Sequence, residues 1–143
     1  MKKKYSVVIK WYRVMRWCYT HHMRIIAKLL YHTIQLLFGC TIPPSAVLEE
    51  GVDIPHFHGI VIHHRSTVGK YTKIYQNVTL GGVKGQGGPT ISDNCVIGCG
   101  ACVLGEIHIG NNVKIGANAV VLKDVPDGCT VVGVPAQIVK RRE

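Results

Sequence analysis

Residues 91–126 read ISDNCVIGCGACVLGEIHIGNNVKIGANAVVLKDVP, and an aliphatic side chain returns at every sixth position of this stretch. The residue four places after each aliphatic is small or apolar, and glycine directly follows three of them. A period of six fits neither an amphipathic helix, which repeats about every 3.6 residues, nor an alternating strand. The aliphatic positions are Ile91, Ile97, Val103, Ile109, Ile115 and Val121.

The same period runs back toward the amino terminus with two breaks. Two extra residues lie between Ile54 and Ile62, and a glycine-rich loop lies within 81–89. The pattern predicts a mainly β chain folded as a parallel β-helix, in which three short strands form each coil and coils stack at about 4.8 Å. Each inward aliphatic then contributes about 1.5–3 kcal/mol by burial. The earlier positions are Ile42, Leu48, Ile54, Ile62, Val68, Ile74 and Leu80.

Length and composition describe one globular domain. The chain has 143 residues, of which 47% are hydrophobic and 17% charged, so it is too apolar for a disordered chain. So few charges predict that part of its surface is buried against copies of itself. Three of the six cysteines crowd residues 95–102, unlike a disulfide framework. We therefore expect reduced thiols and a cytoplasmic protein.

Residues 1–40 differ from the rest, because they hold eight Lys and Arg residues and no acid. Apolar residues at three- and four-residue spacing predict two helices, or one bent helix, that end at Gly39. Charged residues interrupt the apolar run, which excludes a cleaved signal peptide and a spanning helix. We expect residues 1–40 to cap the β-helix or pack between subunits, and residues 41–143 to form the β-helix and its tail. A basic helix carrying Trp11 and Trp17 is also compatible with peripheral contact with an anionic membrane.

Three stretches resemble the hexapeptide acyltransferases, and among these the serine acetyltransferase family: PHFHGIVIHHRSTVGKYTKIYQNVTLGG (55–82), IGCGACVLGEIHIGNNVKIGANAVVLKDVP (97–126) and VVGVPAQIVK (131–140). The family includes shorter relatives that acetylate sugars of surface polysaccharides. The resemblance implies a left-handed β-helix, a homotrimer or dimer of trimers, acetyl-CoA as the acetyl donor and active sites between neighbouring subunits.

The family's catalytic histidine falls on His56, inside the first break of the repeat. An imidazole with a pKa near 6.5 can accept the proton of an attacking alcohol, which is worth roughly 10²–10⁴ in rate. The carboxylate that orients this histidine in the family is replaced by Thr41. Asp53, Glu49 and Glu50 are alternatives, and spacing does not choose among them.

Other positions of the resemblance concern the acetyl donor. Gly82 matches the residue whose backbone N–H faces the thioester oxygen, and such a donor is worth about 10²–10³ in rate. Cys99 and Ala117 match the backbone contacts of the cofactor groove and are one coil of 18 residues apart. Phosphates of the cofactor are candidates for contact with Lys84, in a loop that is either a flexible flap or a lid, and with the tail residues Lys140, Arg141 and Arg142.

The acceptor is an open choice between two alcohols. The family's Arg-His pair after the glycine-rich loop is absent, because GGPTI (87–91) is shorter there. The resemblance assigns that pair to holding serine, so its loss favours a sugar in surface polysaccharide synthesis over L-serine.

Three other functions are weaker alternatives. The histidines at 56, 58, 63 and 64 could collect zinc, but the cysteines diverge around the coil and we predict no required metal. The basic charge lacks the interleaved aromatics of a nucleic-acid platform. A non-catalytic β-helix scaffold is the remaining alternative to an enzyme.

Overall fold

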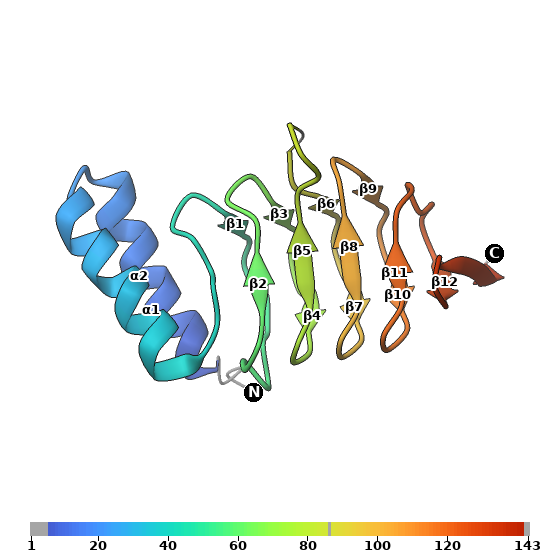
Figure 1. Ribbon diagram of the computed structural model, residues 1–143, viewed down its shortest axis with the longest axis horizontal. Coiled ribbons are helices and arrows are strands. Elements are labelled where there is room, and N and C mark those ends of the chain that lie inside the picture. Colours follow the sequence, from blue (N-terminus) through green and yellow to red (C-terminus); the bar gives the residue numbers. More distant parts are fainter. Residues whose placement is uncertain (1–5, 86, 142–143) are drawn as a thin grey trace.

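The computed structural model describes residues 6–85 and 87–141 of the chain. Two helices precede a series of short strands, and the coils that these strands form follow one another along the long axis of the molecule (Figure 1). The helices are α1 (Val7–Thr20) and α2 (Arg24–Phe38). The strands are β1 (Val47–Leu48), β2 (Val61–Ile62), β3 (Thr67–Val68), β4 (Lys73–Ile74), β5 (Thr79–Gly81), β6 (Thr90–Ile91), β7 (Val96–Ile97), β8 (Cys102–Leu104), β9 (His108–Ile109), β10 (Lys114–Ile115), β11 (Val120–Val121), β12 (Cys129–Val132) and β13 (Gln137–Arg141).

The strands form three sheets, which we call faces A, B and C. Face A contains β2, β5, β8 and β11, face B contains β1, β3, β6 and β9, and face C contains β4, β7, β10, β12 and β13. Every pairing is parallel except that of β12 with β13. All aliphatics of the six-residue period are at most 2% exposed and form one continuous core. The predicted mainly β chain with parallel sheets and a hexapeptide repeat is confirmed.

The chain turns between the faces at three corners, two of which matter for the site. We call residues 55–60, 75–77, 98–100 and 116–118 the C–A corner, because they lead from face C to face A. Residues 63–65, 82–88, 105–106 and 122–124 form the A–B corner. Asparagine or glycine occupies the left-handed turn position of the C–A corner, with φ of +58° at Asn77, +70° at Gly100 and +56° at Asn118.

The helices lie beside the first coil (Figure 1). α1 contacts this coil through polar side chains. The buried Tyr12 hydroxyl donates to the carbonyl of Ala46 at 2.7 Å and accepts from the N–H of Leu48 at 3.0 Å. Arg13 donates to the carbonyls of Leu48 and Glu49, and Arg16 to those of Pro44 and Ala46. These side chains satisfy carbonyls that have no earlier coil to accept from. Two basic residues of the helix that the sequence makes compatible with membrane contact are therefore directed into the protein itself.

Only part of the predicted apolar stripe of the helices is buried. Ile34 is fully buried, whereas Ile25 and Leu29 are 87% and 67% exposed. α2 ends at Gly39 in the left-handed conformation, with φ of +59°. In the described part of the chain, neither helix has the length and hydropathy needed to cross a membrane.

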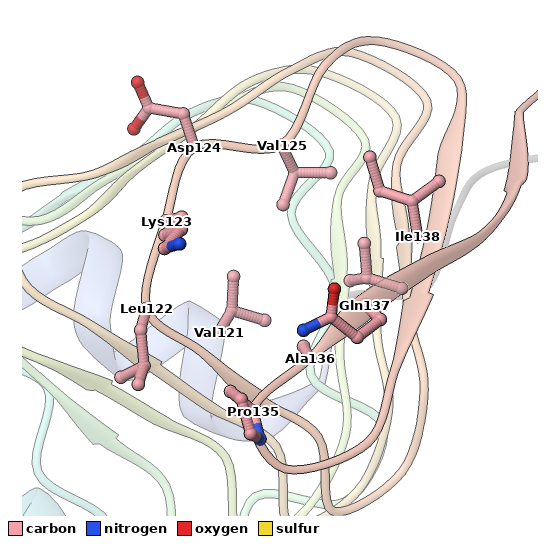
Figure 2. A pocket seen from close by; sticks show the side chains of 10 residues that line it. Val121, Leu122, Lys123, Asp124, Val125, Pro135, Ala136, Gln137 and Ile138 are labelled. Atoms are coloured by element: carbon pink, nitrogen blue, oxygen red, sulfur yellow. The ribbon is translucent and has the colours of Figure 1, made fainter.

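The carboxyl-terminal end of the stack is closed differently. β13 turns back and pairs antiparallel with β12, so the last coil is followed by a hairpin rather than a helix. A pocket of about 330 Å³ opens between this hairpin and the turn after β11 (Figure 2). Val121, Val125 and Ile138 point into it, whereas the carboxylate of Asp124 points away.

Candidate active site

His56 lies at the C–A corner, in the break between Ile54 and Ile62. Phe57 packs edge-on against Phe38 of α2, with ring centroids 5.2 Å apart, and this contact anchors the break. The neighbouring His56 side chain is exposed. Its ring centroid lies 6.5 Å from that of Tyr75, which occupies the same corner one coil further on. The break therefore presents the imidazole on the surface beside Tyr75.

The group that would orient His56 is not found among the predicted candidates. The Thr41 hydroxyl accepts a hydrogen bond of 3.4 Å from Gln35 of α2. Asp53 pairs with Lys73 through its backbone in face C, and the carbonyl of Glu49 accepts from Arg13. Within residues 6–85 and 87–141, no carboxylate is hydrogen-bonded to the His56 ring.

Cys99 and Ala117 continue the same corner beyond Tyr75. The N–H of Asn118 donates to the carbonyl of Cys99 at 2.9 Å, so the two predicted groove residues lie on successive coils. A Cβ at Gly98 would be 2.6 Å from the backbone nitrogen of Ala117, so only glycine permits this close stacking. The Cys99 side chain is partly exposed and Ala117 is exposed. His56, Tyr75, Cys99 and Ala117 thus form one column along the C–A corner.

Gly82 lies at the other edge of face A. It follows β5 at the A–B corner, at the base of the loop that rises at the top of Figure 1. His56 precedes β2 at the opposite edge. The extended residues 78–82 that separate the two corners span roughly 13 Å at about 3.3 Å per residue. One chain therefore does not bring His56 and Gly82 together.

The predicted phosphate contacts are exposed but separate. Lys84 lies in the loop after β5, and Lys140 lies on β13 in face C. Arg142 is outside the described residues, as is the side chain of Arg141. Sequence reasoning missed Lys114, which projects from the same face as Lys140 two strands away, about 10 Å at the usual strand spacing. The signal was a lysine preceding an inward aliphatic of the repeat.

His63 was predicted only as a potential zinc ligand, but it packs against Gly82. A Cβ at Gly82 would be 2.9 Å from His63 Nε2, and a Cβ at Gly88 would be 2.8 Å from His63 Nδ1. The imidazole therefore lies between the two ends of the loop. Burial lowers the pKa of His63, and the neighbouring His64 and Arg65 lower it further.

Two other features lie away from this arrangement. The described residues lining the pocket in Figure 2 do not include His56, Gly82, Cys99 or Ala117. Among the described residues, no group of three or more His, Cys, Asp or Glu side chains is placed to hold a metal ion. All six cysteines are free thiols.

Three faces of parallel strands on a six-residue period define a hexapeptide-repeat protein. Residues 88–123 match the bacterial transferase hexapeptide (six repeats) family. The chain is 49% identical to a serine acetyltransferase of Synechococcus elongatus over 91% of its own length and 54% of that relative. It is 40% identical to a serine acetyltransferase of Helicobacter pylori, over 91% of its length and 78% of the relative. The crystal structure of a Brucella abortus serine acetyltransferase superposes with a TM-score of 0.90 at 36% identity, covering 94% of this chain and 55% of that one.

The chain belongs to the serine acetyltransferase family. It spans about half the length of the Synechococcus relative.

Proposed function

We propose that this protein transfers the acetyl group of acetyl-CoA to the hydroxyl of L-serine. The observation that carries the proposal is the column of His56, Cys99 and Ala117 along one corner of a chain in this family. Similar solved structures include a Neisseria gonorrhoeae serine acetyltransferase in complex with serine and a serine acetyltransferase in complex with CoA. These relatives favour L-serine, the second of the two predicted acceptors, and none of them supports the sugar acceptor.

In this mechanism His56 acts as the general base. Its neutral imidazole accepts the proton of the serine hydroxyl while the oxygen attacks the thioester carbonyl. The carbonyl π electrons move onto oxygen, where the N–H of Gly82 donates to the developing negative charge. Collapse of this tetrahedral intermediate breaks the C–S bond, and the CoA thiolate takes up the proton held by His56. The products are O-acetylserine and CoA.

The separation of His56 and Gly82 within one chain requires a second copy. We propose a homotrimer, or a dimer of trimers, in which the C–A corner of one subunit meets the A–B corner of its neighbour. Acetyl-CoA would then lie along the column of Cys99 and Ala117. Its phosphates would lie near Lys140 and Lys114, with Lys84 reaching from the loop.

The finer architectural predictions are part of the same proposal. A left-handed coil is supported by the superposition on the Brucella structure. A division near residue 40 into a helical cap and a β-helix is supported by the bonds of Tyr12, Arg13 and Arg16 to the first coil. A cytoplasmic location stays a prediction. Peripheral membrane contact is supported only by the exposed Trp17 and Ile25, because Arg13 and Arg16 are directed inward.

An assay of thiol release from acetyl-CoA tests the function. L-serine and nucleotide-linked or lipid-linked sugars are each offered as acceptor to the full chain. We expect release with L-serine, and a fall of roughly 10²–10⁴ in rate for His56→Ala because the general base is lost.

His58→Ala is the matched control, since His58 is an exposed histidine in the same break. It should keep most of the activity. If the CoA thiol is released only when a sugar is offered, the sugar and not L-serine is the acceptor. No release with any acceptor would contradict the enzyme assignment and leave the scaffold alternative.

A further inference from the structure

We propose that His63 is a second donor to the thioester oxygen, acting through Nε2–H beside the backbone N–H of Gly82. This inference rests on the proposed acetyl transfer and assigns a further catalytic residue to it. Sequence resemblance does not mark this position, because the role follows from the packing of two strands that are separated in sequence.

The first observation is the position of the ring. His63 directly follows β2, and Gly82 directly follows the paired strand β5, so the register brings them to the same corner. The three atoms nearest to a Cβ at Gly82 are Nε2, Cδ2 and Cε1 of His63, at 2.9–3.3 Å. These three distances are nearly equal, so the face of the ring at its Nε2 end packs over Gly82, and the Nε2–H bond, which lies in the ring plane, points to the side of this glycine.

The second observation fixes the tautomer. The N–H of Arg65 donates to Nδ1 of His63 at 3.3 Å, so Nδ1 is the acceptor in the neutral ring and the proton is on Nε2. Among the described residues, neither this Nε2–H nor the N–H of Gly82 is hydrogen-bonded to a protein acceptor. Two donors without acceptors, side by side at an exposed glycine, have the composition of an oxyanion hole.

The third observation is the electrostatic setting. Burial, His64 and Arg65 all lower the pKa of His63, which favours the neutral imidazole. The other charged groups on the surrounding elements are Lys84 on the loop and Glu106 on the next coil, which accepts from the N–H of Gly87 at 3.3 Å. A neutral imidazole donates without the desolvation cost of an imidazolium, and it leaves proton transfer to His56.

The loop geometry holds this arrangement. A Cβ at Gly88 would be 2.8 Å from Nδ1 and 2.9 Å from Cβ of His63, so the far end of the loop closes over the other edge of the ring. The ring is thus confined between Gly82 and Gly88. Preorganised donors of this kind are effective because they need no reorganisation during the reaction.

Kinetics of His63→Ala and His63→Gln test the inference. Alanine removes the donor, so we expect kcat to fall by about 10²-fold with little change in KM for acetyl-CoA. Glutamine can place an amide N–H near the position of Nε2, so it should recover a substantial part of kcat. His64→Ala is the control. The ring centroids of His64 and His63 are 4.2 Å apart, but His64 is not among the atoms nearest to a Cβ at Gly82.

Thermal unfolding and subunit assembly are measured for every variant. If the wild type is active and the kcat of His63→Ala is within about threefold of the wild-type kcat, the inference is overturned and the proposed function stands. Equal losses in the alanine and glutamine variants, together with lowered thermal stability, would show a structural role and also overturn it. An inactive wild type with an unaffected fold would overturn the proposed function and this inference with it.

Discussion

The regular faces of the coil, which we call its walls, differ from the two breaks in the repeat in which side chains they contain and how these are buried. In the walls every sixth residue is an aliphatic with at most 2% exposure, and each stacks on its equivalents in the coils above and below. In the breaks, at residues 55–60 and 81–89, the period is lost and histidines or glycines replace the aliphatics. The candidate donors and base all lie at or beside the breaks.

This difference shows how a repetitive fold acquires a site. A wall residue is fixed by its neighbours on both sides, so its side chain cannot be exchanged for a functional one without cost. A break releases the chain from that stacking, and Phe57 shows how the released segment is anchored elsewhere, on Phe38. The stack provides rigidity, and the breaks provide exposed functional groups.

The largest effect is expected in the wall, at Ile97. This side chain is fully buried between Ile74 and Ile115. Ile97→Asp would place a carboxylate in the core with no partner, so the free energy of unfolding should fall by about 5 kcal/mol or more. Urea denaturation followed by circular dichroism measures this loss.

Val96→Asp is the matched control for Ile97→Asp. Val96 is the adjacent residue of the same strand, and it faces outward between Lys73 and Lys114. A carboxylate there meets two lysines, so stability should change by less than about 1 kcal/mol. Comparable losses for the two variants would show that the six-residue period does not set the inward face.

The regular faces of the coil could be predicted from the sequence, because each six-residue repeat shows which of its own residues points inward. Each inward position is occupied by an aliphatic residue of the six-residue period. Neither an α-helix nor an alternating strand would place all thirteen of these residues on one side. The ends of the stack could not be predicted in this way. α1 docks through Tyr12, Arg13 and Arg16, which satisfy backbone carbonyls of residues 44–49, and no apolar pattern signals such contacts.

The candidate site was predictable only where a family motif covers it. The resemblance marks His56 and Gly82, but the distance between them depends on the width of face A, which the sequence does not display. His63 lacks a motif, and its contact with Gly82 arises because β2 and β5 are paired in register. Tyr75 is next to His56 for the same reason, since successive coils share a corner.

A smaller effect is expected in the second break, at Gly88. A Cβ here would be 2.4 Å from Ser66 Oγ and 2.8 Å from His63 Nδ1. Gly88→Ala should therefore lower the free energy of unfolding by about 1–3 kcal/mol and displace the His63 ring, reducing kcat. Denaturation and thiol-release kinetics measure the two effects.

Gly85→Ala is the control within the same loop. Gly85 has φ of +80°, and no described residue beyond its chain neighbours lies within 4 Å of an added Cβ. The cost of alanine is therefore conformational, about 1 kcal/mol, and His63 is not displaced. Its kcat should equal that of the wild type. If both alanines reduce kcat equally, loop flexibility rather than the packing of His63 controls the rate.

Alkylation sharpens the assignment of the cofactor groove at the C–A corner. Cys99 is a free, partly exposed thiol, whereas burial raises the pKa of both Cys40 and Cys95 to about 11. Iodoacetamide at neutral pH should modify Cys99 and spare these two. Acetyl-CoA at ten times its Kd should slow the Cys99 reaction about tenfold by occupying the groove. Peptide mass spectrometry reports both results, and unprotected Cys99 would contradict the proposed groove.

The smallest effect is a pKa change at His63 that measures its surroundings. Burial is the largest cause of the lowered pKa, followed by His64 and Arg65. Arg65→Gln removes one of the positive charges that oppose the imidazolium, so the pKa of His63 should rise toward 6.5. A folded-state pKa below that of the unfolded chain favours folding above pH 6.5, and this contribution is lost as the pH falls from 6.5 through the folded value. Arg65→Gln should therefore narrow the pH range between the folded-state and unfolded-state pKa values of His63, over which this contribution to stability is lost. Proton NMR titration of the His63 ring measures the rise. The same titration in Lys123→Gln is the control, because Lys123 lies three coils further along the A–B corner, roughly 14 Å away at the usual strand spacing. An unchanged pKa in Arg65→Gln would mean that burial and His64, and not Arg65, lower the pKa of His63.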